Sequence, residues 1–80
     1  MADREDPLYQ VVGAMLQVDP SDLDDSSSPQ TVASWESTTH LGLVMALEEE
    51  FGVSLTPEEA LEMETVGLIR AILRDHGVEV

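Results

Sequence analysis

The sequence predicts an all-α fold: four helices, with a long loop between the first and second helices and a short third helix. Three observations lead to this fold class. Apolar residues recur at the spacing of amphipathic helices, and proline, glycine and capping residues bound these stretches. No stretch alternates apolar and polar residues as a half-buried strand would. We expect one domain over residues 1–80, with a core that buries only about 60% of the unfolded surface.

The first helix is expected over about residues 7–18. Asp6 provides an N-cap, and Pro7 occupies the first helical position, where a missing N–H costs nothing. Asp19-Pro20 ends the helix, because the residue before a proline avoids the α region. One face of this helix is apolar and consists of Leu8, Val11, Val12, Met15 and Leu16.

A loop rich in serine and aspartate follows over residues 19–36 and is long for a connection in so small a domain. Leu23 and Val32 are its expected anchors in the core. The acidic residues of this loop do not form a calcium-binding loop. Counted from Asp19, the sixth position is Asp24, where such a loop requires glycine.

The second helix is expected over about residues 37–51. Ser34, Ser37 and Thr38 are the alternatives for its N-cap, because a side-chain oxygen there accepts a hydrogen bond from the first turn. Gly52 ends the helix, since glycine adopts the left-handed conformation at low cost. The apolar face is expected to consist of Leu41, Val44, Leu47 and Phe51, with Leu43 beside it.

The third and fourth helices begin at clear capping signals. Thr56 and Glu59 form a capping box that predicts a short helix over about residues 57–62. Thr65 caps a fourth helix over about residues 66–76. Its buried face is expected to consist of Val66, Ile69, Ile72 and Leu73.

The chain is strongly acidic: seventeen Asp and Glu residues, three arginines and no lysine give a net charge of -14. This balance argues against binding to nucleic acid or to an anionic membrane, and it favours basic protein partners. Glu48, Glu49 and Glu50 oppose the dipole at the end of the second helix. The lack of cysteine excludes disulfides and thiolate metal sites. The N-terminus lacks the features of a signal peptide, so we expect a cytoplasmic protein. We also expect a monomer.

Ser37 and His40 lie one helical turn apart, which raises the hypothesis of a nucleophile with its base. Such a pair also needs an orienting acid and an oxyanion hole in a cleft, and a small helical domain has little material for one. We therefore expect no catalytic residue and no metal site. Two interpretations of Ser37 remain: a helix cap, or an exposed hydroxyl that receives a covalent modification.

The junction Glu36-Ser37-Thr38 and the segment 43–52 resemble the acyl and peptidyl carrier proteins. That family typically has Asp-Ser-Leu at the start of its second helix and an acidic run before Phe-Gly at its end. The segment here reads Leu-Val-Met-Ala-Leu-Glu-Glu-Glu-Phe-Gly, which fixes the register of Ser37. The resemblance extends from the first helix to Thr65-Val66 and implies a four-helix bundle of the acyl-carrier type.

The resemblance implies that Ser37 carries a 4′-phosphopantetheine arm, transferred from coenzyme A by a phosphopantetheinyl transferase. The thiol of that arm would hold an acyl or aminoacyl group as a thioester, and the chain would be a non-catalytic carrier. The other implied partners are an acyl-loading ligase or acyltransferase and downstream biosynthetic enzymes with basic docking patches. The implied docking residues lie on or next to the second helix: Glu36, Thr38, Leu41, Met45, Glu48 and Glu49.

Four positions depart from the family pattern. Glu36 replaces the usual Asp, and Thr38 replaces the Leu after the serine. Thr39 and Gly42 stand where fatty-acid carriers often have acidic residues. This more neutral half of the helix favours a carrier in polyketide, nonribosomal-peptide or related specialised biosynthesis. The alternative is an acidic helical protein-interaction domain without a prosthetic group, which would present its second helix to a basic partner.

Overall fold

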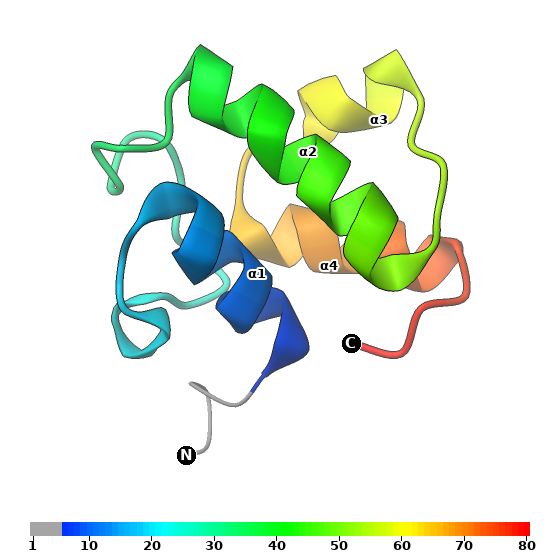
Figure 1. The fold of residues 1–80 in the computed structure, drawn as a ribbon, viewed down its shortest axis with the longest axis horizontal. Helices are drawn as coiled ribbons and strands as arrows, with labels where there is room; N and C mark the ends of the chain where they lie inside the picture. The colour runs from blue at the N-terminus through cyan, green and yellow to red at the C-terminus, as the bar shows by residue number, and fades with distance from the viewer. Residues whose placement is uncertain (1–5) are drawn as a thin grey trace.

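The computed structural model describes residues 6–80, and the expectation about a signal peptide falls partly on residues 1–5, outside this range. Within it, the predicted all-α fold is confirmed (Figure 1). In Figure 1, α2 runs between α1 and α3, and α4 lies behind it. The helices of residues 6–80 fall short of the length and apolar character that a membrane crossing requires. The elements in chain order are α1 (Pro7–Leu16), the 3-10 helix η2 (Pro20–Asp22), α2 (Ser37–Phe51), α3 (Pro57–Glu62) and α4 (Val66–Asp75).

Helix α1 starts as predicted but ends earlier than expected. The Asp6 carboxylate accepts the backbone N–H of Leu8 at 2.9 Å, which confirms the N-cap. The helix ends at Leu16 and not near residue 18, because Gln17 takes a left-handed conformation with a φ of 60°. The chain then folds back closely over Gly13, where an added Cβ would lie 2.8 Å from a backbone oxygen of the following turn.

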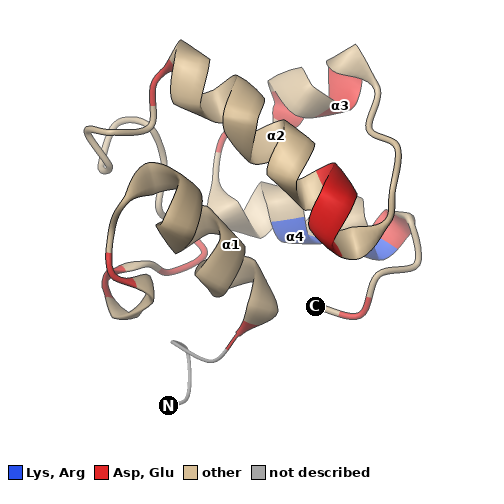
Figure 2. Ribbon diagram, in the orientation of Figure 1, with Lys and Arg blue, Asp and Glu red and all other residues tan. Residues whose placement is uncertain are grey.

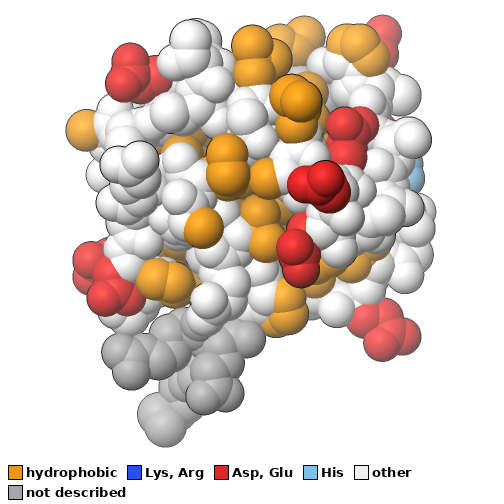
Figure 3. Space-filling model, in the orientation of Figure 1, with side chains coloured by type: hydrophobic (Ala, Val, Ile, Leu, Met, Phe, Trp, Pro, Cys, Tyr) orange, Lys and Arg blue, Asp and Glu red, His pale blue; other side chains and the backbone are white. Residues whose placement is uncertain are grey.

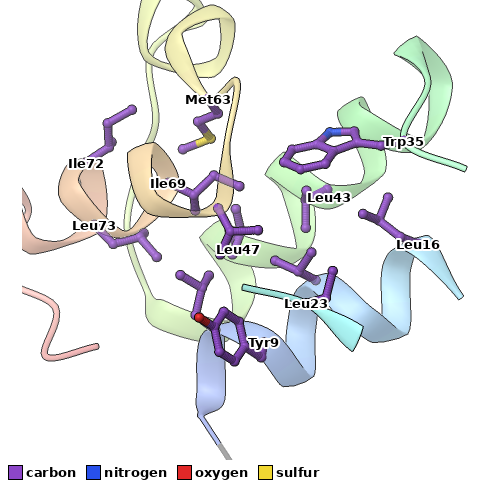
Figure 4. Close-up of a cluster of buried hydrophobic side chains, with 13 residues drawn as sticks. Tyr9, Leu16, Leu23, Trp35, Leu43, Leu47, Met63, Ile69, Ile72 and Leu73 are labelled. Carbon is purple, nitrogen blue, oxygen red and sulfur yellow. The ribbon is translucent and has the colours of Figure 1, made fainter. Parts of the chain in front are cut away.

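The core consists mainly of aliphatic side chains with two aromatic rings, contributed by α1, the long loop, α2, α4 and the segment between α3 and α4 (Figure 4). Leu23 anchors the long loop as predicted, and Val32 packs at the edge of the same cluster. The buried hydrophobic residues are Leu8, Tyr9, Val12, Leu16, Leu23, Trp35, Leu43, Leu47, Met63, Val66, Ile69, Ile72 and Leu73.

The prediction for the buried face of α2 was wrong in part. Leu43 and Leu47 are fully buried, whereas Leu41 is 65% exposed. Val44 and Phe51 are half-buried at the edge of the core. The reason is tertiary: α1 packs against α2 along the Leu43 side, which leaves Leu41 beside α3.

A polar cluster fixes the long loop to α1 and α4, and sequence analysis did not foresee it. The buried guanidinium of Arg70 lies 3.0 Å from the Asp6 carboxylate and 3.1 Å from the Asp25 carboxylate. Tyr9 donates its hydroxyl proton to Asp25 at 2.9 Å. The backbone N–H of Gly67, in the first turn of α4, donates to the Asp25 carbonyl at 2.8 Å. The loop therefore supplies hydrogen-bond acceptors that the start of α4 would otherwise lack.

Candidate functional site

Ser37 is the first residue of α2, at the point where the long loop ends (Figure 1). Its side chain is exposed, and within residues 6–80 its hydroxyl makes no hydrogen bond. None of the three N-cap alternatives is the cap, because Glu36 occupies that position with extended backbone angles. Ser37 is therefore free of the capping role that was its simplest structural explanation.

The turn before α2 is held by Thr39 and Ser34. The Thr39 hydroxyl accepts the backbone N–H of Glu36 at 2.7 Å, and its own proton faces the carbonyls of Ser34 and Glu36 at 2.7 and 2.9 Å. The Ser34 hydroxyl donates to the Leu16 carbonyl at 2.7 Å, which ties this turn to the end of α1. These bonds give Ser37 a well-defined backbone without using its own side chain.

His40 is committed to structural hydrogen bonds. Its Nδ1 lies 2.9 Å from Nε1 of Trp35, and its Nε2 lies 2.9 Å from the carbonyl of Ala60 in α3. The indole N–H only donates and the carbonyl only accepts, so Nδ1 accepts and Nε2 carries the proton. A neutral imidazole held at both nitrogens has no lone pair left to act as the base for Ser37.

A groove of about 600 Å³ opens beside Ser37, between the start of α2 and α3. Leu41 projects from its α2 side, and Leu61 projects from its α3 side with 78% of its surface exposed. Sequence analysis missed Leu61, because a helix of six residues is too short to show an apolar period. The other lining residues are Pro29, Trp35, Glu36, His40, Ala60, Met63 and Glu64.

A capping box starts α3, and one side-chain contact joins it to the end of α4. Thr56 and Glu59 form the predicted capping box, with bonds of 3.0 and 3.1 Å. The Glu59 carboxylate also lies 2.9 Å from Nε2 of His76. The hydrogen bond from the Thr56 backbone, followed by the one from His76, lowers the pKa of the Glu59 carboxyl below its ordinary value. Helix α3 is thus fixed at its start, although it is short.

The sequence-predicted docking residues lie on the same side of α2 but not in one patch. Leu41 lines the groove beside Ser37, whereas Met45, which is 68% exposed, lines a second hollow of about 560 Å³ between α1 and α2. Glu36 and Thr38 are exposed at the start of the helix. The apolar contact residues near Ser37 and those farther along α2 therefore lie in two separate hollows.

Acidic residues mark only the C-terminal end of α2 (Figure 2). The space-filling view shows hydrophobic side chains next to this acidic end on the same face (Figure 3). Glu49 is exposed there, whereas Glu48 is half-buried and its carboxylate accepts the backbone N–H of Leu55 at 2.8 Å. Glu48 therefore also stabilises the segment after the helix, a role that sequence analysis did not foresee.

Comparison with known proteins shows to which family the chain is similar. The chain is 39% identical over 56 residues to a protein of Thermosynechococcus vestitus named acyl carrier protein. The match covers 70% of this chain and 69% of the cyanobacterial protein. No protein-family model matches the chain.

Proposed function

Because this chain belongs to the acyl carrier protein family, we propose that it carries an acyl or aminoacyl group on a 4′-phosphopantetheine arm attached to the hydroxyl oxygen of Ser37. The observation that supports this proposal is the state of Ser37 itself: exposed, on a rigid turn, and without a hydrogen bond within residues 6–80. When bound, the arm supplies a terminal thiol that holds the cargo as a thioester.

The surroundings of Ser37 fit a phosphodiester. The residue opens a helix of fifteen residues, whose first-turn N–H groups and dipole favour a negative group. The first turn of α2 contains no acidic residue, and the one neighbouring carboxylate is that of the N-cap residue Glu36. The hydroxyls of Ser34 and Thr39 are already hydrogen-bonded, so they do not compete as attachment points. Thr38 is exposed like Ser37, and the choice between these two rests on the register of the family motif.

The chain would catalyse nothing itself, and its partners would supply the chemistry. We propose a phosphopantetheinyl transferase, an acyl-loading ligase or acyltransferase, and downstream enzymes with basic docking patches. Glu49 and the Glu48 carboxylate, of which Oε2 already accepts the Leu55 N–H, would attract such patches. Leu41 and Met45 would provide the apolar contact. Because attraction between exposed charges speeds encounter more than it tightens binding, these complexes would be transient.

The pathway is proposed from the character of α2. Its N-terminal half presents apolar and hydroxyl side chains, and its carboxylates are confined to the C-terminal half. An enzyme that recognises an acidic patch around the serine would find none on this helix. We therefore place the protein in polyketide, nonribosomal-peptide or related specialised biosynthesis.

Intact-mass measurement tests the proposed modification. Protein incubated with coenzyme A and a broad-specificity phosphopantetheinyl transferase is expected to gain one phosphopantetheine. Ser37→Ala should stay unmodified, whereas Ser54→Ala, which removes another exposed serine, should react like wild type. Unmodified wild type with several transferases, or equal reaction of Ser37→Ala, would contradict the proposal and favour an interaction domain without a prosthetic group.

A further inference from the structure

The groove beside Ser37 has a closed floor. The floor consists of the Trp35 indole, the His40 imidazole and the Ala60 carbonyl, joined by two hydrogen bonds of 2.9 Å each. The two rings are stacked, with centroids 6.1 Å apart and planes inclined by 22°. This chain of contacts links the loop before α2, α2 itself and α3, so it spans the boundary between the two helices.

Fully packed core lies directly behind this floor. Trp35 is only 3% exposed, and Figure 4 shows its indole next to Leu43. Leu43 and Leu47 are likewise buried, belong to the same cluster and do not line the groove. A group that moved from the groove into the core would have to separate α2 from α3 at His40. That movement would leave the buried indole N–H of Trp35 without a partner, and it would remove one of the two hydrogen bonds that the Ala60 carbonyl accepts, which is unfavourable.

The surface side of the floor offers an easier place for an apolar group. Its volume of about 600 Å³ lies within the usual range of small-molecule sites. Leu41 and Leu61 are exposed on its two sides, and covering them would remove apolar surface from water. Ser37 lines the same groove. A chain tethered at Ser37 would have a high effective concentration there, so weak contacts would suffice to hold it.

Resting on the proposed attachment at Ser37, we propose that the Trp35–His40–Ala60 chain acts as a seal between α2 and α3. The seal keeps the tethered arm and its apolar cargo in the surface groove and out of the helical core. Trp35 and His40 are positioning residues in this sense: they determine where the cargo lies without touching the attachment bond. The cargo would then remain accessible to partner enzymes that dock on α2.

The test uses a tether that does not depend on any transferase. The chain contains no cysteine, so Ser37→Cys introduces a single thiol that octyl methanethiosulfonate can label with an apolar chain. Methyl NMR then reports where the octyl group lies. We expect shifts at Leu41 and Leu61, no shifts at Leu47 and Leu73 in the core, and an unchanged indole N–H signal from Trp35.

Variants in the same Ser37→Cys background separate the seal from the groove. His40→Ala removes both hydrogen bonds, and it should let the octyl-induced shifts reach Leu43 and Leu47, which are buried and do not line the groove. If His40→Ala does not fold, Trp35→Phe removes the indole N–H and keeps a ring in the core, and it should have the same effect to a smaller degree. Leu61→Ala should reduce the shift at Leu41, whereas Leu68→Ala, on α4 outside the groove, should not.

Two results would overturn the seal. One is an octyl group that shifts core methyls while Leu41 and Leu61 stay unchanged in the parent Ser37→Cys protein. The other is the same shift pattern with and without an intact His40 or Trp35. Failure of enzymatic modification at Ser37 would appear only in the mass measurement, so it cannot be confused with either result.

Discussion

At the scale of single residues, Arg70 is the buried charge on which the arrangement of the loop depends. It is the charged residue within residues 6–80 that is buried, and it faces two carboxylates. Burial by itself would lower the pKa of Arg70, but the hydrogen bonds to Asp25 and Asp6 outweigh it and raise that pKa. For Asp25, burial acts to raise the pKa, and the hydrogen bonds from Arg70 and Tyr9 leave it below the ordinary value. The ionised forms are thus favoured by folding.

A prediction about acid stability follows from the lowered pKa of Asp25. A carboxyl group with a depressed folded-state pKa stabilises the fold fully above its unfolded pKa, near about 4, and loses this effect as the pH falls through its folded pKa. Asp25→Asn should therefore be less stable than wild type at neutral pH, and the difference should shrink in acid. Thermal unfolding by circular dichroism between about pH 7 and pH 3 checks this. A difference that stays constant over that range would contradict it.

At the scale of elements, α2 shows how differently two glycines act. Gly52 ends the helix with a φ of 66° and has nothing within 4 Å of where a Cβ would lie. Its role is purely conformational. Gly42 lies inside the helix, where an added Cβ would meet the flexible end of Met15 at 3.2 Å. Replacing these two glycines by alanine should thus change the free energy of unfolding in opposite directions.

Gly52→Ala should lower the free energy of unfolding by about 1–2 kcal/mol, because alanine is strained in the left-handed conformation. Gly42→Ala is its matched control and should range from neutral to a gain of about 1 kcal/mol, since alanine favours a helix interior and Met15 can move. Urea unfolding of both variants measures these values. If Gly42→Ala lowered the free energy of unfolding as much as Gly52→Ala, this would show that the Met15 side chain cannot move aside.

At the scale of the whole molecule, charge repulsion limits stability. A net charge of -14 on 80 residues destabilises the compact state, while the ion pairs around Arg70 compensate only part of it. The acidic residues within residues 6–80 are distributed over several elements (Figure 2). Their mutual repulsion therefore acts across the domain and not at one site.

Added salt should stabilise this protein. Raising sodium chloride from about 0.01 M to 0.1 M shortens the Debye length from about 30 Å to about 10 Å, so repulsion between exposed carboxylates weakens more than the partly buried pairs do. We expect the melting temperature to rise over this range. Sucrose at matched osmolality is the control for general solvent effects. An unchanged or lower melting temperature in salt would mean that the charges are better compensated than their count indicates.

The sequence by itself determined the features that depend on neighbouring residues. Asp6, Thr56 and Thr65 are the N-caps of α1, α3 and α4, as predicted, because a cap acts on the backbone two or three residues away. Gly52 likewise ends α2 in the left-handed conformation. The all-α class and the acyl-carrier resemblance rest on such local signals, and the comparison with the cyanobacterial protein supports the resemblance.

Only the tertiary structure decided which side chains meet across the fold. Arg70 and Asp25 are separated by 45 positions, and His40 reaches Ala60 across 20, so no local period announces either contact. Packing also left Leu41 exposed, because the face that α2 buries depends on how α1 and α4 surround it. A sequence pattern shows which positions are apolar, but the packing of the helices around one core decides which of these positions are buried. The groove beside Ser37 and its sealed floor result from that packing.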